Sequence, residues 1–473
     1  MSRDFAALID ACEADLRAGA TRNCAARLRE LKNARIARKW KQPLARLCRR
    51  AGLFDLGLRL LAGIVGEEKL HPKVTAAELA EYGALLLRCG ATHEARTTLT
   101  IAANQSSTDA HLYLAFCDFD QWRFSEAVGH LERYLNSALE PYARVLGQVN
   151  LAFALIASER FDGALDWLQR TASEAQERGY VRLLANCREL QGQAYLMRDD
   201  FVSARRALNE AAAFLGSGLA LDQLYVEKGQ SIVNAVESRS VEPLVAFRPK
   251  AVAAGHAESV RQLDLFRLKL NPEMKLFEQL YVGTPFPEFR ARLKKIFPAG
   301  GEPSSTCWGT AAGSEIDLSN DDHRAPVVMA ALLQDFYRWP RMGGLFSLLF
   351  PGEHYDVFSS PNRVYQTLHR TRDWITAAGL PLKIVGRESQ FELVAKGEIR
   401  LRVSAESRRP GKFAVLLGEL AKTFMNRDGF TARDVREYLG LTKSGFQRFA
   451  EWAVEKRHLR KFGASTSTLY YFE

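Results

Sequence analysis

The sequence of 473 residues predicts a mostly α protein, with an N-terminal α-solenoid of helical hairpins followed by two small C-terminal α+β domains. Three observations predict this fold class. Small residues recur at fixed intervals through the first part of the chain, which contains little proline. Pro and Gly then gather in one stretch, and the last third holds two helix-rich segments that each end in a pair of short strand patterns. A chain of this length is too long for one compact core, so several domains are expected.

These patterns divide the chain into four parts. We expect a helical array in 1–284, a linker in 285–324, a first α+β domain in 325–403 and a second one in 404–473. The Pro- and Gly-rich stretch is densest from 298 to 324, where it is typical of a linker or a surface loop.

Five segments of the array share one pattern of small residues. In each, a small residue is followed twelve positions later by a second one and sixteen positions later by leucine. Small residues let two antiparallel helices approach closely, so each set predicts one hairpin. The sets are Ala45/Gly57/Leu61, Gly83/Ala95/Leu99, Ala115/Ala127/Leu131, Ala152/Ala164/Leu168 and Gly192/Ala204/Leu208. Nine positions after the first small residue stands an aromatic residue expected to seal the turn, namely Phe54, Phe124, Phe161 or Phe201, with Thr92 as the exception.

This pattern resembles the tetratricopeptide repeat (TPR) family. The sequence departs from that family because its units lack the early Trp and the closing Pro, and because the spacing between units varies. The resemblance implies a TPR-like array that binds a peptide or protein or mediates homodimer formation. Further helices at 224–236 and 257–270 are expected to continue the stack. An apolar patch of Leu112, Phe116 and Phe119 has two interpretations, a peptide-binding surface or packing between neighbouring repeats, and packing is the commoner role.

The last 45 residues show a sharp succession of helix signals. Thr431 is placed to cap a short helix that ends at Gly440, and Thr442 is placed to cap a second helix. Two strand patterns follow, at 459–462 and 468–472, around the small polar turn 463–467. The first of these helices has apolar residues at Val435, Tyr438 and Leu439, and the second has an apolar stripe of Phe446, Phe449, Ala450, Ala453 and Val454.

With the preceding helix 414–425, this segment resembles a winged helix-turn-helix, a fold that commonly reads DNA with its second helix in the major groove. The resemblance implies that the side of the second helix opposite its apolar stripe contacts DNA, and that the first wing strand contacts phosphate or the minor groove. The expected DNA-binding residues here are Lys443, Ser444, Gln447, Arg448, Arg460 and Lys461.

A similar arrangement precedes it. Helical pieces at 327–337 and 344–350 lead to a longer helix that opens at Ser360 or Asn362 and ends near 378, followed by strand patterns at 382–385 and 391–394. In this helix Val364, Leu368, Thr371 and Ile375 are expected to face the core.

The segment resembles the winged helix of response regulators, which implies a second DNA-reading helix and wing. The expected contacts are Arg363, Gln366, Thr367 and Arg370 on the helix and Arg387 on the wing. No acidic receiver domain accompanies it, so phosphorylation of that kind is not the expected control.

The charge is unevenly placed. Positions 325–473 contain 23 Lys and Arg against 15 Asp and Glu, whereas positions 1–324 contain 42 against 40. Such an asymmetry favours a polyanionic partner for the last third, although a solvated basic surface has the same composition.

No P-loop, HExxH, GxSxG or GxGxxG motif is present, and the nine His show no metal-ligand spacing. We therefore expect no enzyme, no cofactor and no metal site. The seven Cys form no CxxC pair, no apolar run is long enough to span a bilayer, and the N-terminus resembles no signal peptide, so a cytoplasmic protein without a membrane partner is expected.

The leading interpretation is a DNA-binding transcriptional regulator. Its array would sense a peptide or protein or mediate dimerisation, and its tandem winged helices would bind double-stranded DNA. The alternative is a protein-interaction scaffold, since helical repeats that end in a winged helix also resemble scaffold subunits of the proteasome lid and of translation initiation complexes. In that case Phe446, Trp452 and Tyr470 are candidates for a protein interface. Binding to phosphates weakens steeply with salt, whereas an apolar interface does not, so salt dependence separates the two.

Overall fold

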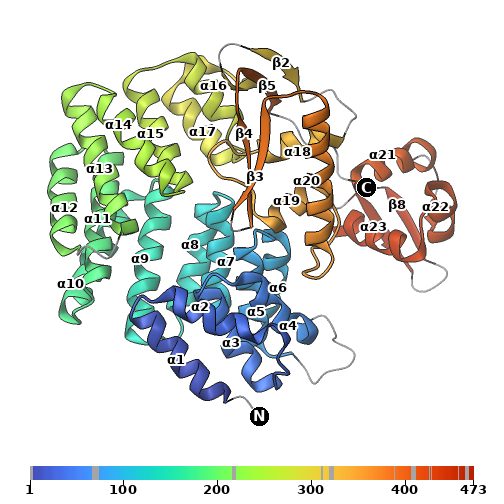
Figure 1. Ribbon diagram of the computed structural model, residues 1–473, viewed down its shortest axis with the longest axis horizontal. Helices are drawn as coiled ribbons and strands as arrows, with labels where there is room; N and C mark the ends of the chain where they lie inside the picture. The colour runs from blue at the N-terminus through green and yellow to red at the C-terminus, as the bar shows by residue number, and fades with distance from the viewer. Residues whose placement is uncertain are drawn as a thin grey trace.

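The computed structural model of the chain is shown in Figure 1. It describes residues 4–65, 74–215, 220–310, 313–318, 324–387, 389–405, 412–425, 427, 429–455, 458–463 and 468–472. Helices dominate these ranges, as the sequence predicts, and the strands found in them are short and lie after residue 304. Within the described ranges, no helix combines the length and the apolar character needed to cross a membrane.

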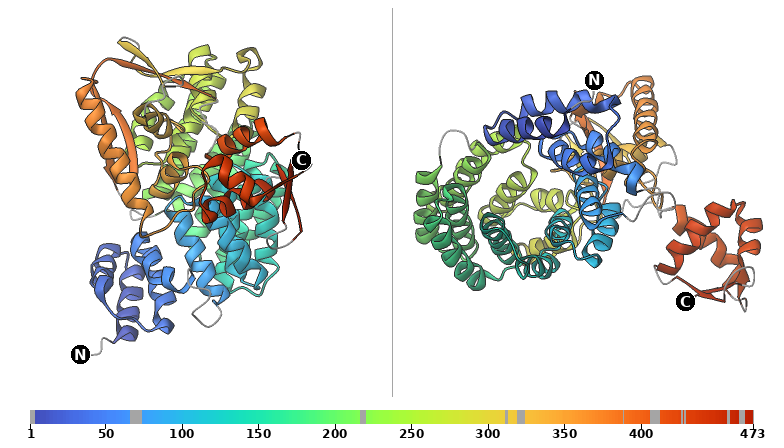
Figure 2. Two further views of the ribbon diagram at one scale, coloured as in Figure 1. Left: turned by 90° about the vertical axis from the view of Figure 1, so that its right-hand side faces the viewer. Right: turned by 90° about the horizontal axis from the view of Figure 1, so that it is seen from below.

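The first part of the chain is a TPR-like array of antiparallel helical hairpins. Seen from below, these helices follow a strongly curved path (Figure 2). They are α1 (Phe5–Arg17), α2 (Thr21–Arg29), η1 (Glu30–Asn33), α3 (Arg38–Arg50), α4 (Phe54–Val65), α5 (Ala76–Arg88), α6 (Thr92–Asn104), α7 (Thr108–Asp120), α8 (Phe124–Leu135), α9 (Pro141–Ala157), α10 (Phe161–Glu177), α11 (Val181–Met197), α12 (Phe201–Phe214), α13 (Ala220–Ser238), α14 (Glu242–Ala253), α15 (Ala257–Leu270) and α16 (Met274–Val282).

The small residues of the repeat pattern lie where the two helices of each hairpin touch. All five predicted hairpins form, as α3–α4 through α11–α12, and the patterned small residues are buried. A Cβ atom added to Gly83 would lie 2.6 Å from Cγ of Leu99, and one added to Gly192 would lie 2.7 Å from Cγ of Leu208. Only glycine leaves room for these leucines, so the spacing of the pattern reflects direct helix–helix contact.

The turn between the two helices has the same backbone conformation in each of the five hairpins. The aromatic expected to seal the turn is the first residue of the second helix in four hairpins, and the exception, Thr92, takes the same position in the remaining one. Two positions earlier the backbone is left-handed in each, at Gly52, Gly90, Trp122, Glu159 and Asp199, with φ between 59° and 82°. Such a residue ends the first helix and reverses the chain, so each unit turns in the same way.

The expected linker is wrong in its described part. This stretch contains α17 (Pro287–Ile296), η2 (Pro298–Gly300), β1 (Ser305–Gly309) and β2 (Ser314–Asp317). Both strands pair with β5 (Ile399–Ser404), β1 in antiparallel and β2 in parallel orientation. The Pro and Gly composition indicated a loop, and the strand that completes this sheet lies far along the chain, after the strand patterns at 382–385 and 391–394, so no local signal revealed the pairing.

The first α+β domain continues with α18 (Arg324–Leu332), α19 (Met342–Leu349), α20 (Ser360–Ala377), β3 (Leu382–Arg387) and β4 (Gln390–Ala395). Strands β3 and β4 form the predicted hairpin. Directly before α19, Arg341 forms an isolated bridge with Gln390 of β4. The order is therefore helix, a short pairing segment, two helices and a hairpin.

The C-terminal part repeats this order in a separate small unit, red in Figure 1. It contains α21 (Lys412–Phe424), β6 (Phe430–Thr431), α22 (Ala432–Leu439), α23 (Lys443–Glu455), β7 (Leu459–Phe462) and β8 (Leu469–Phe472). The strand order is β6-β8-β7, so the short strand before α22 pairs with the second hairpin strand, as Arg341 does in the first domain. Its hydrophobic core is formed by residues of this unit.

The local signals that predicted this unit are present. Thr431 and Asp434 form a capping box, Gly440 is left-handed with φ 63°, and Oγ1 of Thr442 accepts a hydrogen bond from the backbone N–H of Gly445 at 3.1 Å. Strand β6 was not predicted because it has only two residues. Within the predicted turn 463–467, residues 464–467 lie outside the described part of the chain.

The first α+β domain is fixed to the array. Arg338 donates to the carboxylate of Asp120 at 2.7 Å and to its backbone carbonyl at 2.8 Å. The backbone N–H of Tyr355 donates to Oε1 of Glu94 at 2.7 Å. One hydrophobic cluster runs from the N-terminal helices into this domain. The array and the domain therefore share a core.

Candidate nucleic-acid interface

Helix α20 is the central element of the first candidate site. Val364, Leu368, Thr371 and Ile375 are all buried, as predicted, because they recur at helical spacing on the side that packs against α18, α19 and β3. Their burial fixes the rotation of the helix, and hence the direction of every other side chain on it.

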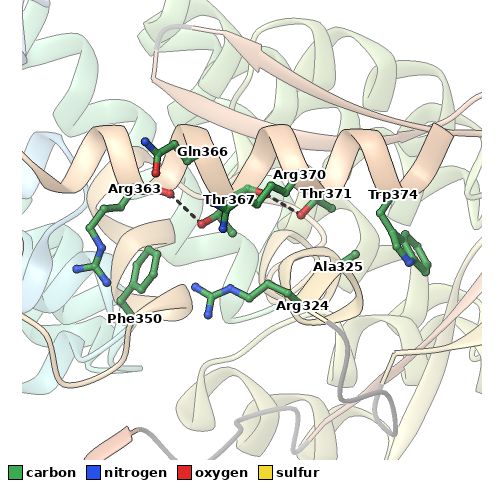
Figure 3. Close-up of a pocket in the computed structure, with 9 residues that line it drawn as sticks. All are labelled: Arg324, Ala325, Phe350, Arg363, Gln366, Thr367, Arg370, Thr371 and Trp374. Atoms are coloured by element: carbon green, nitrogen blue, oxygen red, sulfur yellow. Dashed lines mark hydrogen bonds between the residues drawn. The ribbon is translucent and has the colours of Figure 1, made fainter. Parts of the chain in front are cut away.

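A pocket of about 620 Å³ lies beside α20 (Figure 3). The four residues predicted to form a free helix face all line it, together with the start of α18 and the end of α19. Three arginines line it, one from the start of α18 and two from α20, so the pocket is cationic. The lining residues are Arg324, Ala325, Phe350, Arg363, Gln366, Thr367, Arg370, Thr371 and Trp374.

Arg363 is half-buried, with its side chain 41% exposed and engaged by two neighbours. Its guanidinium donates to both carboxylate oxygens of Glu353, at 2.6 and 3.2 Å, and lies 4.0 Å from the ring centroid of Phe350. The hydrogen bonds from Arg363 to Glu353 raise the pKa of the guanidinium above its ordinary value. The guanidinium is thus held by a bidentate partner and a stacked ring, while part of the side chain reaches solvent, and DNA contact by Arg363 stays a prediction.

The outward placement of Thr367 is wrong. This side chain is 9% exposed, and its hydroxyl donates to the backbone carbonyl of Arg363 at 2.8 Å. The offsets of three, four and seven residues place four side chains on one broad face, but the edge of that face at Thr367 is covered by the neighbouring helices. Gln366 and Arg370 are exposed, as predicted.

Sequence reasoning missed two further exposed residues of α20. Tyr365 is 50% exposed, and His369 is exposed with its Nδ1 atom 2.9 Å from Asp373. The aromatic ring and the imidazole lie next to Gln366 and Arg370 on the solvent side of the helix. The spacing of the buried positions was sufficient to predict that these two side chains are exposed, because residues between the buried positions of a helix face away from its core.

The β3–β4 hairpin carries Arg387, which is exposed as predicted. The tip beyond it is anchored, because the backbone N–H of Met342 donates to the carbonyl of Ser389 at 2.9 Å and that of Phe391 donates to Pro340 at 3.1 Å. The hairpin of this domain therefore lies against its own chain at one side and presents Arg387 at the other.

Helix α23 is the central element of the second candidate site. Phe446, Phe449, Ala450 and Ala453 are buried, as predicted. The predicted stripe is one residue too long, since Val454 is 36% exposed, and Tyr438 of α22 is exposed as well, with its hydroxyl accepting a hydrogen bond from Thr423. Both lie at the edges of the apolar faces, where the core of a small unit ends.

The opposite side of α23 faces solvent. Lys443, Ser444, Gln447 and Arg448 are all exposed, as the pattern predicts. Gln447 donates to Glu451 at 3.0 Å, and Nε of Arg448 donates to the backbone carbonyl of Ser444 at 3.4 Å. These contacts stay within one turn of the helix, so the side chains are ordered along a surface that no other described element covers.

Strand β7 lies next in sequence and carries three exposed side chains in a row, Arg460, Lys461 and Phe462. Phe462 is 74% exposed. The strand pattern did not indicate that this hairpin exposes a large apolar ring beside two cations.

Among the described residues, no group of three or more His, Cys, Asp or Glu side chains is arranged to hold a metal ion. The exposed and cationic side chains of α20, α23 and the two hairpins suit contact with a polyanion.

No family model and no curated protein matches the chain. Solved helical-repeat structures do. A Rap protein in complex with competence and sporulation factor is 11% identical, covers 79% of this chain and 98% of its own length, and has a TM-score of 0.40. A Rap conjugation gene regulator in complex with the Phr* peptide is 11% identical, with coverages of 80% and 98% and a TM-score of 0.39.

A tetratricopeptide repeat protein from Parabacteroides merdae is 14% identical, with coverages of 56% and 98% and a TM-score of 0.39. The identities and TM-scores of all three structures are low, so nothing about the function of this chain follows from them.

Proposed function

We propose that this protein is a DNA-binding transcriptional regulator whose two C-terminal α+β domains are winged helices. The shared order of elements supports the proposal. In both domains a helix is followed by a short pairing segment, two helices and a hairpin, and the pairing segment bonds to the second hairpin strand. This is the arrangement expected of a winged helix-turn-helix, and it occurs twice in the basic third of the chain.

The observation that carries the proposal is the two-sided character of α23. One side is buried by aromatic and small residues, and the other presents Lys443, Ser444, Gln447 and Arg448 to solvent. Gln and Arg can make paired hydrogen bonds to base edges in the major groove, and Lys and Ser can contact phosphate oxygens. The positive side chains of β7 then lie on a wing that reaches the flanking backbone.

In the first domain, the exposed part of α20 supplies the equivalent surface. Gln366 and Arg370, with Tyr365 and His369 beside them, contact DNA in this proposal. The sequence predicted this role for a set that also includes Arg363 and Thr367. Arg363 supports the pocket wall through Glu353 and Phe350. Arg387 on the hairpin is placed for phosphate contact.

The array takes the regulatory part in this proposal, either as the site of a peptide or protein ligand or as the surface of a homodimer. Its attachment to the first domain supports this role. Asp120, at the end of α7, holds Arg338, and Glu94, in α6, holds the backbone of Tyr355. A change in the curvature of the array would therefore move the segments on both sides of α19.

The aromatic patch of the array takes no part in this role. The rings of Phe116 and Phe119 lie 5.9 Å apart, and that of Phe119 lies 5.2 Å from Phe153 in the next hairpin. These rings pack against one another between neighbouring repeats, which is the commoner of the two roles expected for them.

The test is fluorescence anisotropy of the full-length protein with a random-sequence duplex at low and moderate salt. The full chain is required because the first domain shares its core with the array. We expect micromolar binding that weakens steeply as salt rises. The affinity should fall by roughly tenfold or more when the salt concentration increases about fourfold. Absence of binding at low salt would refute the proposal and favour the protein-interaction scaffold.

A further inference from the structure

The N-terminal hairpins carry a dense basic cluster. Residues 17–50 contain twelve Lys and Arg and a single acidic residue, Glu30. The near balance of charge over positions 1–324 hides this cluster, because acidic residues elsewhere in the array compensate for it. The cluster runs from the last residue of α1 through α2 and η1 to the end of α3, at the blue end of the chain in Figure 1.

Four of these cations are neutralised by carboxylates of neighbouring helices. Each pair is a close contact, and together they stabilise the packing of the first hairpins. They are Arg27 with Asp15, Arg38 with Glu78, Arg49 with Glu81 and Arg50 with Glu13. These four carboxylates are therefore already engaged.

A cleft of about 770 Å³ lies where η1 and the segment after it pass over α3 and α4. Five cations line it, and Asp55 is the acidic residue among its lining residues. Within the part of the chain that the structure describes, none of the five forms an ion pair. They are Arg29, Lys32, Arg35, Lys41 and Arg59.

The floor of the cleft is aliphatic. Leu31 and Leu60 are buried beneath it, while Ile36, Leu53 and Leu56 are half-buried and line the cavity. A volume of this size suits a ligand of a few residues or a compact small molecule. Apolar groups of a ligand would be shielded from water on these side chains, which favours binding in proportion to the area they bury.

We propose that this cleft binds an acidic peptide segment in which carboxylates alternate with aliphatic side chains. The cations pair with the carboxylates, and the aliphatic side chains enter the floor. Nucleic acid fits less well, because the cleft-lining residues include no aromatic ring on which a base can stack. The inference builds on the proposed function, since it gives the array ligand a place and a chemistry.

The test uses the full-length protein and a fluorescent peptide of about twelve residues that combines glutamates with leucines. Two companion peptides replace either all glutamates by glutamine or all leucines by serine. We expect the parent peptide to bind, and both companions to bind at least about tenfold more weakly, because the cleft uses charge and apolar contact together.

Variants locate the site. Arg35→Gln combined with Lys41→Gln is expected to weaken binding of the parent peptide about tenfold, while Arg59→Gln gives a smaller loss in the same direction. Arg46→Gln is the matched control, because Arg46 is exposed on α3 outside the cleft. It should leave the affinity within about twofold. Circular dichroism confirms that each variant is folded.

Equal binding of the serine companion, or an equal loss in the Arg46 variant, would overturn the proposal in favour of unspecific charge attraction. A DNA duplex is also tested as a competitor of the peptide, with the parent protein and with the combined Arg35→Gln and Lys41→Gln variant. Competition in the parent protein that is absent in the variant would show that the cleft is a nucleic-acid site. DNA binding itself is measured in parallel with Lys443→Ala. Loss of peptide binding with intact DNA binding, or the reverse, thus separates this inference from the proposed function.

Discussion

Arg261 and Asp335 form a buried ion pair across the junction between the array and the first α+β domain, in which one guanidinium nitrogen contacts both carboxylate oxygens. Nη2 of Arg261 lies 2.7 and 2.6 Å from the two carboxylate oxygens of Asp335, and the Arg261 side chain is 1% exposed. The guanidinium lies 5.6 Å from the ring centroid of Trp122 and 5.3 Å from that of Phe286. The pair thus joins α15, a hairpin turn of the array, the start of α17 and the segment before α19 at one point.

Replacement of Asp335 by Asn should destabilise the protein strongly, because it leaves the Arg261 cation buried without its main counter-charge. We expect a loss of about 3 kcal/mol or more in the free energy of unfolding, measured by urea titration. The matched control is Glu258→Gln, which removes the other carboxylate paired with Arg261. Glu258 is 41% exposed, so that change should cost at most about 1 kcal/mol. Equal effects of the two variants would contradict the role given to Asp335.

Replacement of Gly192 by Ala should also destabilise the protein. The added methyl group would lie 2.7 Å from Cγ of Leu208, which is fully buried and cannot move aside freely. We expect a cost of about 1–3 kcal/mol from overpacking. Gly163→Ala is the opposite case, because Gly163 is exposed on α10 with no atom within 4 Å of an added Cβ. That variant should be neutral or more stable by up to about 1 kcal/mol. Thermal melts of both variants give the comparison.

The parts of the fold that the sequence predicted are those held by local contacts. The hairpins were predictable because the two helices of each unit meet through residues twelve and sixteen positions apart, such as Gly192 and Leu208. The sheet of β1, β2 and β5 was not predictable in this way, because Ser305 pairs with Ser404. No local pattern in a Pro- and Gly-rich stretch indicates a partner at that distance.

The candidate sites show the same limit. Helical spacing correctly placed Gln366, Arg370 and the polar side of α23 toward solvent. It did not predict that Thr367 is buried, because the burial of this residue depends on which neighbouring helix covers that edge of α20. The basic cleft was missed for a different reason. The charges of positions 1–324 nearly balance, and only the fold shows which cations have no carboxylate partner among the described residues.

The ion pair between Arg38 and Glu78 should make part of the stability depend on pH. Hydrogen bonds from Arg38 lower the pKa of Glu78 from its ordinary value of 4.5 to about 2, against the opposing effect of burial. Because the folded protein holds the ionised form, the contribution is complete above pH 4.5 and is lost as the pH falls towards 2. The difference in melting temperature between the parent protein and Glu78→Gln should therefore be largest near neutral pH and should narrow between pH 4.5 and 2. A difference that stays constant over this range would contradict the assignment.

Substitutions on α23 and β7 should separate affinity for DNA from sequence preference. Lys443→Ala and Arg460→Ala are expected to weaken binding similarly for all duplexes and to reduce the salt slope by about one each, because their proposed partners are phosphates. Gln447→Ala and Arg448→Ala should instead lower discrimination between duplexes by about 1–3 kcal/mol, because their proposed partners are base edges. Arg206→Ala, which removes an exposed cation from the array, is the control for loss of charge alone. Duplexes selected from a random pool provide the specific and mismatched probes. If all four α23 and β7 variants bind and select like the parent protein, the polar side of α23 is not the DNA-reading surface.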